Sequence, residues 1–438
     1  MKILMIYMGL GNLPIPKFHH GIGSLAAVLK EKGHLVSLLY APDFDNATVV
    51  TKLDEFSPHL IGISFISPKA RAARRVCDLC ARQRPQTPIV LGGIHPTVCP
   101  EECIHYPGVT AICIGEGEES FLQFVSALDS GDKRVDIPGL WINDQGHVVR
   151  NPVRQWISDL NALPFADREI FDHQREIDAL GGRTVFITGR GCPFNCSFCV
   201  NRALGHLVGR ATNPVRRRSV RHVIREIEQV VQRYESVRLI SFQDDTFTLQ
   251  PKWLAEFCSE YARRVDIPFI CQSRADTMNP RIADLLASAN CVEVRIGLET
   301  GDDYLRNQVL GKRVSRRQII DAFDILQRRG IRTMAYVMIG VPFETRKSLQ
   351  KTYDLCVAVN PNFIRVSTFQ PFPGTQLLEL CEKEGWLNSR TFETLYDASI
   401  LDQPGVTQKD LDFFRGLFQK RFRDVPEAGL ISKTRQPG

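Results

Sequence analysis

The feature that most constrains this chain is a run of three closely spaced cysteines within residues 189–200. Cys192, Cys196 and Cys199 lie four and then three residues apart, among glycines and a proline. This composition predicts a loop that folds its thiolates around one centre. Three thiolates without a fourth nearby suit a cubic iron-sulfur cluster with one open iron, whereas a closed structural zinc site would require four ligands. A zinc or other structural thiol cluster is the alternative.

The remaining cysteines and the N-terminus bear on the cellular compartment. The 438-residue chain has 13 cysteines, and residues 1–7 form an apolar run too short for a signal peptide or a membrane span. We therefore expect a cytoplasmic protein whose thiols are free or metal-bound. Five cysteines near the N-terminus could hold a second cluster, but buried small hydrophobic side chains are the simpler interpretation. They are Cys77, Cys80, Cys99, Cys103 and Cys113.

Charge gives little indication of a macromolecular partner. The formal net charge of +6 is modest and scattered, and the densest basic run is Arg216–Arg218. On a chain of this length we interpret the run as a solvated face rather than a phosphate-binding surface. The sequence thus predicts no membrane span and no nucleic-acid partner.

Strands and helices alternate in two parts of the chain, which predicts two α/β domains. We place a Rossmann-like domain at residues 1–135, a linker with a hairpin at 136–181, a second α/β domain at 182–385 and a helical tail at 386–438. Such alternation implies parallel strands joined by right-handed crossovers, with ligand-binding loops at the carboxyl ends of the strands. The first domain has expected strands at 2–7, 35–40, 60–65, 88–91 and 109–114, and its strand-end glycines include Gly9 and Gly11.

The second domain has six expected strands, too few for a closed eight-stranded barrel. They fall at 184–187, 237–242, 269–272, 292–297, 332–339 and 363–369. Helices are expected at 220–234, 253–264, 280–289, 315–329 and 345–359. The tail contains one amphipathic stretch, 409–422, which we interpret as a lid or a packing helix, and a polar end that we expect to be disordered.

The spacing C-x3-C-x2-C, with Phe198 just before the third cysteine, resembles the radical S-adenosylmethionine (SAM) superfamily. The resemblance implies a partial (β/α)6 barrel and a [4Fe-4S] cluster held by Cys192, Cys196 and Cys199, with Phe198 beside the cofactor. It also implies that SAM is chelated by the open iron and cleaved to a 5′-deoxyadenosyl radical, and that an electron donor such as flavodoxin or ferredoxin reduces the cluster. In such enzymes the cofactor carries the difficult chemistry.

Residues that follow the barrel strands are the next candidates, because barrel chemistry gathers at the carboxyl ends of strands. The family places acidic residues after the second strand to accept hydrogen bonds from the SAM amino group, which here implies Asp244 and Asp245. Arg274 would suit the SAM carboxylate, and a salt bridge to Asp276 is the equal alternative. Glu299, in a Gly-x-Glu segment, is implied to hold the ribose hydroxyls.

Two later strand-end segments are similar to the family's adenine-side loop and last-strand turn. They are Gly340–Glu344 and Gln370–Thr375. The first departs from the family pattern because Phe343 stands where glycine is common. Phe343 either narrows the substrate side or, in the simpler interpretation, packs within its loop.

The first domain carries a second resemblance. The segments Gly92–Thr97, Pro100–Glu102 and Gly115–Glu118 are similar to the cobalamin (B12)-binding domain that precedes many radical SAM domains. In that family the nucleotide tail of the ligand passes a serine and a Gly-Gly pair, which implies Ser64, Gly92 and Gly93 as cofactor-binding residues. His95 is a further candidate, and His19, His20 or His95 could face cobalt. Loop histidines that only form hydrogen bonds are commoner.

One motif of cobalamin-binding domains is absent. The sequence contains no Asp-x-His-x-x-Gly segment, which supplies a lower axial histidine in methionine-synthase-like domains. The absence fits a domain that binds B12 without a protein histidine, and it equally fits a domain that has lost B12.

The two resemblances together imply a radical SAM enzyme that abstracts hydrogen from a small-molecule substrate, with cobalamin-dependent C-methylation as the outcome. The first alternative is a B12-free rearrangement, dehydration or cyclisation. The second is an RNA-modifying methylthiotransferase-like enzyme, although the sequence has neither a further upstream cysteine triad nor a downstream RNA-binding module. The third is a non-enzymatic zinc-thiolate or sensor protein. The sequence does not identify the substrate.

Overall fold

A computed structural model describes residues 1–9, 17–42, 45–132 and 134–422. The chain divides into two compact units. Unit 1 comprises Met1–Glu176 with Ala203–Ala211, and unit 2 comprises Ile177–Arg202 with Thr212–Gly438. Two of the three boundaries between them fall inside α7 (His173–Ala179) and α8 (Asn201–Leu207), and the third follows Ala211.

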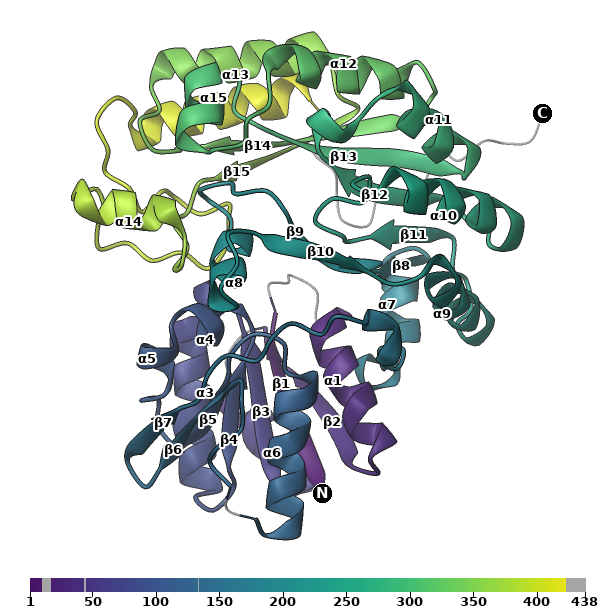
Figure 1. The fold of residues 1–438 in the computed structure, drawn as a ribbon. Helices are drawn as coiled ribbons and strands as arrows, with labels where there is room; N and C mark the ends of the chain where they lie inside the picture. Colours follow the sequence, from purple (N-terminus) through teal and green to yellow (C-terminus); the bar gives the residue numbers. More distant parts are fainter. Residues whose placement is uncertain (10–16, 43–44, 133, 423–438) are drawn as a thin grey trace. The chain divides into compact units, whose positions relative to one another are not determined.

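Unit 1 is built on a seven-stranded sheet with the order β2-β1-β3-β4-β5-β6-β7 (Figure 1). The first five strands are parallel, and β6 and β7 add an antiparallel hairpin at one edge. The hairpin predicted within residues 136–181 thus extends this sheet. The strands are β1 (Lys2–Met8), β2 (Leu35–Tyr40), β3 (Leu60–Phe65), β4 (Ile89–Gly92), β5 (Val109–Cys113), β6 (Leu140–Asp144) and β7 (His147–Arg150).

Helices cover this sheet in pairs. α1 (His20–Glu31) packs beside α6 (Glu118–Ser130), and α2 (Asn46–Phe56) packs beside α3 (Ala70–Gln83). The short helices α4 (Ile94–Val98) and α5 (Pro100–Cys103) follow β4. Buried β-branched and leucine side chains fill the space between strands and helices, as expected for a parallel sheet covered on both faces.

The cysteines of α3 belong to this apolar core. Cys77 and Cys80 are fully buried, and Cys113 of β5 is 7% exposed. Burial raises the pKa of Cys80 to about 12, so its thiol stays protonated at neutral pH. The burial of Cys77, Cys80 and Cys113 supports their interpretation as small hydrophobic side chains rather than cluster ligands.

Unit 2 contains the half-barrel that the sequence implied. Six parallel strands follow one another in chain order, β8-β11-β12-β13-β14-β15. They are β8 (Arg183–Phe186), β11 (Leu239–Phe242), β12 (Phe269–Ser273), β13 (Cys291–Glu299), β14 (Arg332–Ile339) and β15 (Phe363–Thr368). The predicted fold class, a Rossmann-like domain followed by a partial (β/α)6 barrel, is confirmed.

The helices of unit 2 form an outer layer in which each packs against the next (Figure 1). They are α9 (Val220–Arg233), α10 (Pro251–Arg264), α11 (Pro280–Ser288), α12 (Arg316–Gln327) and α13 (Arg346–Val359). The apolar residues of α9 recur at three- and four-residue steps and are buried. Ser315 and Thr345, the first residues of two predicted helices, are N-caps that form capping boxes.

The cysteine segment begins as a strand, although the sequence predicted a loop. β9 (Gly189–Cys192) pairs antiparallel with β10 (Asn213–Arg217) in a separate two-stranded sheet. The glycines explain the difference. A Cβ atom at Gly189 would lie 2.6 Å from the carbonyl oxygen of Arg216, so only glycine lets the partner backbone come this close. The pairing gives Cys192 a fixed backbone position at the end of β9.

The basic run Arg216–Arg218 is not a solvated face, and that prediction is wrong. The side chains of Arg217 and Arg218 are 5% and 11% exposed. Arg217 lies over the ring of Trp253, 4.5 Å from its centroid, and Arg218 pairs with Glu226 at 2.5 Å. Carboxylates from other elements draw these guanidinium groups inward, which no local charge pattern reveals.

The C-terminal tail packs on the barrel. α15 (Gln408–Arg421) buries Leu411, Phe414 and Phe418 in the core of unit 2, and α14 (Gln376–Lys383) precedes it. The stretch predicted to be a lid or a packing helix is therefore a packing helix. The predicted polar end, like Gly11, lies outside the described residues. Within the described part of the chain, no helix is both long and apolar enough to cross a membrane.

Candidate functional site

The cysteine loop of unit 2 is held by one segment of the same unit, residues 309–312. The amide of Ser197 donates to the carbonyl of Leu310 at 3.1 Å, and its hydroxyl donates to the carbonyl of Val309 at 2.5 Å. Gly311 has φ +62°, and a Cβ atom there would lie 3.3 Å from the carbonyl oxygen of Asn195. This close approach fixes the backbone around Cys196.

The three thiols fit a cluster better than a single ion. Cys196 is 8% exposed, and burial raises the pKa of Cys199 to about 11, with Asp245 and the neighbouring thiols adding to the effect. Metal binding would therefore have to displace the thiol protons. Within the described residues, the three sulfur atoms do not form a set lying within 4.8 Å of one another. One tetrahedral zinc ion would hold its sulfur ligands closer, at about 3.8 Å for Zn–S bonds of about 2.3 Å.

The two adjacent carboxylates after β11 have different surroundings. Asp244 is 4% exposed and accepts hydrogen bonds from the amide and hydroxyl of Thr188, and Arg217 pairs with it at 3.2 Å. Burial raises the pKa of Asp244, and Arg217 and Thr188 oppose that rise. The carboxylate of Asp244 is therefore already bound by Thr188 and Arg217, whereas Asp245 is exposed.

Asp245 is joined to the cluster loop by Asn201, a residue that the sequence did not single out. The Asn201 amide nitrogen lies 3.1 Å from Asp245 Oδ2 and 3.7 Å from Cys199 Sγ. Asn213 of β10 donates to Asn201 Oδ1 at 2.9 Å and so fixes the amide orientation. Surrounding protein raises the pKa of Asp245, while the Asn201 hydrogen bond lowers it. The arrangement places one exposed carboxylate, held by Asn201, near Cys199.

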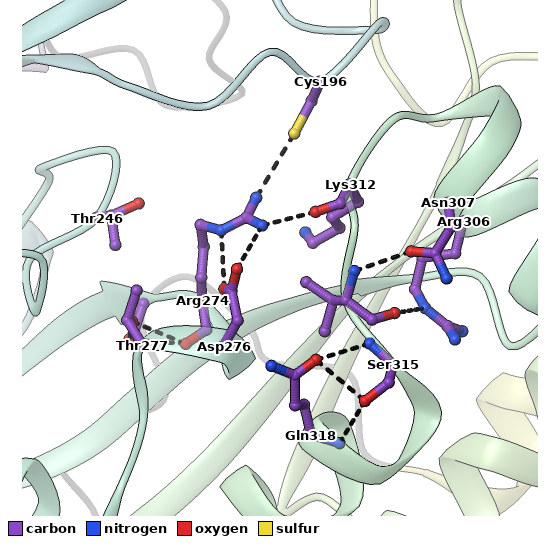
Figure 2. Close-up of polar contacts among 12 residues, drawn as sticks. Cys196, Thr246, Arg274, Asp276, Thr277, Arg306, Asn307, Lys312, Ser315 and Gln318 are labelled. Carbon is purple, nitrogen blue, oxygen red and sulfur yellow. Dashed lines mark hydrogen bonds and ion pairs between the residues drawn. The ribbon is translucent and has the colours of Figure 1, made fainter.

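Arg274 lies at the cysteine loop rather than free at the strand end (Figure 2). Its Nε and Nη2 atoms each donate to Asp276 at 2.9 Å, which is the salt bridge that the sequence left as an alternative. Its Nη1 lies 3.5 Å from Cys196 Sγ, and its Nη2 donates to the carbonyl of Lys312 at 2.8 Å. Arg274 is thus engaged by protein groups on several sides.

Glu299 ends β13 in a conformation that the Gly-x-Glu spacing explains. Its φ is +64°, and β13 has a register shift between Gly297 and Glu299. A Cβ atom at Gly297 would overlap the Glu299 carboxylate and the Lys312 ammonium, so glycine leaves room for both. Lys312 Nζ donates to Glu299 Oε1 at 2.7 Å. A strained residue at a strand end, paired with a buried lysine, is typical of a binding site. The sequence did not predict Lys312.

The loop after β14 contributes a neutral acid and an exposed ring. Glu344 is fully buried and accepts a hydrogen bond from the amide of Gly340, and burial raises its pKa to about 8. Phe343 is 42% exposed, and its ring meets Trp386 edge-on at 4.9 Å. This contact fits the interpretation of Phe343 as a packed loop residue. Phe198 packs against the same apolar cluster that contains Trp386.

In unit 1 the predicted cofactor residues meet at the carboxyl ends of β3 and β4. Ser64 is the direct register partner of Gly92. Gly93 has φ +95°, and a Cβ atom there would lie 2.7 Å from the carbonyl oxygen of Phe65, so this position requires glycine. A Cβ atom at Gly92 would meet nothing closer than 4.0 Å. Thr97 joins this edge to the next by donating to the Gly93 carbonyl and accepting from the Gly115 amide.

The histidines of unit 1 are held by protein contacts. His95 is 4% exposed, with Nδ1 3.0 Å from the Ser67 hydroxyl and Nε2 3.7 Å from Glu102. His19 is the N-cap of α1, where its Nδ1 accepts from the Ile22 amide at 3.2 Å. The His20 ring packs edge-on against Phe18. These contacts favour the hydrogen-bonding interpretation, and a role of His95 at the cofactor stays a prediction.

Comparison with known proteins identifies both domains. Residues 186–356 match the model of the radical SAM superfamily, and residues 17–125 match the model of the B12-binding domain. The first match spans the cysteine loop and the strand ends that carry Asp245 and Glu299. The second spans the edge formed by Ser64, Gly92 and Gly93.

Individual relatives match most of this chain. An uncharacterized methyltransferase of Pyrococcus horikoshii is 28% identical over 82% of this chain and 77% of its own length. An anaerobic magnesium-protoporphyrin IX monomethyl ester cyclase of Rubrivivax gelatinosus is 26% identical, over 86% of this chain and 70% of its own length. The structure of the radical SAM methyltransferase TsrM from Kitasatospora setae, with cobalamin and a [4Fe-4S] cluster bound, superposes with a TM-score of 0.72. It covers 89% of this chain and 76% of TsrM at 19% identity, which establishes a shared fold.

Fold, cysteine loop and domain matches together define a radical SAM enzyme, a class that uses a [4Fe-4S] cluster and SAM. The additional N-terminal match makes the assignment more specific. The chain belongs to the B12-binding-domain-containing radical SAM enzyme family.

Proposed function

We propose that this protein is a cobalamin-dependent radical SAM methyltransferase that methylates a carbon atom of a small-molecule substrate. The observation that carries the proposal is one strand-end edge of unit 2, where three cysteines lie beside the carboxylate of Asp245, in a chain that also has a B12-binding domain. The methyltransferase relative from Pyrococcus horikoshii supports the same reaction class.

In the proposed enzyme, Cys192, Cys196 and Cys199 would hold the [4Fe-4S] cluster. When bound, the cluster and SAM supply a 5′-deoxyadenosyl radical, and cobalamin supplies the methyl group. The fixed backbone around Cys196 and the hydrogen bond from Asn201 to Cys199 orient the thiolates.

We assign the SAM-binding roles differently among the sequence candidates. Asp245 is exposed beside Cys199 and can accept hydrogen bonds from the SAM amino group, whereas Asp244 is paired with Arg217. Glu299 holds the ribose hydroxyls, and Lys312 holds the Glu299 carboxylate in place through its ammonium group. Phe198 packs beside the cofactor. Arg274 is committed to Asp276 and Cys196, so we do not assign it to the SAM carboxylate.

For cobalamin we assign the β3–β4 edge of unit 1. Ser64 offers a hydroxyl next to Gly92, whose Cβ position is open, so the nucleotide tail can pass close to the backbone. His95 supports this edge through Ser67 and is a weaker candidate for ligand contact. Burial lowers the pKa values of both His19 and His95. Neither is presented on an Asp-x-His-x-x-Gly segment, so the proposal has B12 bound without an axial histidine from the protein.

The alternative outcome is ring closure without methyl transfer. The cyclase relative from Rubrivivax gelatinosus, 26% identical over most of this chain, is the observation that favours it. A flavodoxin or ferredoxin is proposed as the electron donor in either case. We do not propose an RNA-modifying methylthiotransferase, because the sequence has neither the further upstream cysteine triad nor the downstream RNA-binding module of such an enzyme.

The test is anaerobic expression with B12 supplied, followed by incubation with reductant, SAM carrying a labelled methyl group, and candidate substrates. We expect corrinoid absorbance in the purified protein, and formation of both 5′-deoxyadenosine and S-adenosylhomocysteine with label in the product. 5′-Deoxyadenosine alone, with no labelled product, would support cyclisation or rearrangement. A reconstituted protein that never cleaves SAM would contradict both proposals.

A further inference from the structure

Arg274 occupies a position that the radical SAM assignment does not explain. It is 6% exposed and follows β12, and its Nη1 points at the sulfur of Cys196 (Figure 2). We propose that Arg274 is a positioning residue of the cluster, which donates an N–H to the Cys196 thiolate and thereby raises the reduction potential of the bound cluster. This inference rests on the cluster of the proposed function and goes beyond it by naming a group that tunes the electron step.

The guanidinium group is fixed from three directions. Asp276 accepts from Nε and Nη2, each at 2.9 Å, in a two-pronged pair, and the carbonyl of Lys312 accepts from Nη2 at 2.8 Å. The ring of Phe194, within the cysteine loop, lies 3.6 Å from the guanidinium carbon. Only Nη1 is left to face the cysteine, at 3.5 Å from Cys196 Sγ. Arginine is suited to this arrangement because its donors form a rigid planar fork.

The same contacts explain why Arg274 is not well placed to bind the SAM carboxylate. Reaching a ligand would require the buried Arg274 side chain to leave Asp276 and the Phe194 ring, both of which are only partly exposed. Breaking this largely buried pair would leave the guanidinium charge without its partner, which is unfavourable. The structure therefore commits the guanidinium to the cysteine loop.

A hydrogen bond to a cluster sulfur changes the electron affinity of the cluster. The donor withdraws charge from the thiolate, so it stabilises the reduced, more negative cluster more than the oxidised one. The effect is stronger where water is excluded, because the local dielectric constant is low. Asp276 offsets part of the positive charge, but the N–H that faces Cys196 remains directed at the sulfur.

Arg274 also connects the cluster loop to the predicted ribose-binding acid. Its Nη2 donates to the backbone of Lys312, and Lys312 Nζ pairs with Glu299 at 2.7 Å. The neighbouring carbonyl of Leu310 accepts from Ser197 in the cysteine loop. One arginine thus holds the 309–312 segment against both the cluster ligands and the strand end that carries Glu299.

The experiment is an anaerobic redox titration of the reconstituted full-length enzyme, followed by electron paramagnetic resonance of the reduced cluster, without SAM. In Arg274→Gln we expect unchanged iron and sulfide content and a ratio of reduced to oxidised cluster about tenfold lower at a fixed potential, which corresponds to a midpoint about 59 mV more negative. Arg274→Lys keeps a donor near the sulfur and should shift the midpoint less. Arg264→Gln is the matched control, because Arg264 makes a similar two-pronged pair with Glu228 on the outer helices.

Three results would overturn the proposal. An unchanged midpoint in Arg274→Gln with a full cluster would show that the contact does not tune the potential. Weaker SAM binding, with an unchanged midpoint potential in the absence of SAM, would indicate that Arg274 binds the SAM carboxylate instead. Loss of iron in both Arg274 variants would make the residue purely structural. Because the titration needs neither cobalamin nor substrate, its outcome is independent of whether the enzyme methylates.

Discussion

The carboxyl edges of the two sheets are built in opposite ways. The edge of unit 2 presents charged side chains, with Asp245 beside Cys199 and Glu299 paired with Lys312. The edge of unit 1 presents backbone, with an open Cβ position at Gly92 and a glycine-only conformation at Gly93. Unit 2 thus has charged side chains at its strand ends, whereas unit 1 has glycines, which carry no side chain, at the corresponding positions.

The difference corresponds to the ligands that we propose. SAM carries an amino group, a carboxylate and ribose hydroxyls, each of which requires a specific partner. The nucleotide tail of cobalamin is long and is accommodated by close approach to a strand edge, for which the absence of a side chain matters most. Substitutions in unit 2 should therefore act through lost charges and ligands, and substitutions in unit 1 through added atoms.

The largest expected effect is on iron content, and it should differ between cysteine substitutions in unit 2 and in unit 1. Cys196→Ala should abolish the cluster, because two thiolates cannot replace three, and SAM cleavage should fall to background. Cys77→Ala, in the core of unit 1, should leave iron content unchanged and should only lower stability slightly. Iron and sulfide analysis after anaerobic reconstitution measures both. If Cys77→Ala lost iron in proportion, a second cluster in unit 1 would have to be reconsidered.

The next prediction separates the two adjacent carboxylates of unit 2. Asp244→Asn leaves Arg217 buried without its charge partner, so we expect a loss of about 3–5 kcal/mol in unfolding free energy. Asp245→Asn removes an exposed charge and should change stability by less than about 1 kcal/mol. It should instead weaken SAM binding, by about tenfold, as one lost charge-assisted hydrogen bond. Denaturant unfolding and SAM titration measure the two effects, and equal stability losses would contradict this division.

The sequence predicted the fold and the candidate strand ends because hydrophobic periodicity and strand-helix alternation are local signals. It could not separate Asp244 from Asp245. The two neighbours differ in the side chains that contact them from other parts of the chain. Thr188 and Arg217 contact Asp244, and Asn201 contacts Asp245. The same limit explains the error at Arg216–Arg218, because the partners of Arg217, Asp244 and Trp253, are distant in sequence. Lys312 was missed because no spacing rule connects it with Glu299. The position of a residue on a strand follows from local sequence, whereas its side-chain partners depend on the tertiary structure.

A pair of glycine variants tests the edge of unit 1. Gly93→Ala forces an alanine into a backbone conformation that glycine favours, against the Phe65 carbonyl, and should cost about 1–3 kcal/mol of stability together with cobalamin binding. Gly92→Ala meets only open space within the protein, so stability should be kept while cobalamin affinity falls. Thermal unfolding and corrinoid absorbance after reconstitution report the two quantities. Full cobalamin binding by Gly92→Ala would argue against this edge as the site.

The smallest expected effect concerns Glu344, a charged residue type that unit 2 keeps uncharged. Burial raises its pKa from 4.5 to about 8, so the folded state retains a proton that the unfolded state releases. Stability is therefore highest below pH 4.5, falls as the pH rises toward 8, and levels off above it. Between pH 7 and pH 8 this group alone should remove about 1 kcal/mol.

Glu344→Gln is the matched variant, because it keeps the shape and the oxygen that accepts from the Gly340 amide but cannot ionise. Denaturant unfolding of both proteins at pH 6, 7 and 8 should show a flatter pH dependence for the variant, so that its stability relative to the native protein improves as pH rises. Parallel curves would mean that Glu344 is already ionised in the folded state. In that case Glu344 would be grouped with the charged strand-end residues of unit 2, such as Asp245 and Glu299, rather than with its uncharged core.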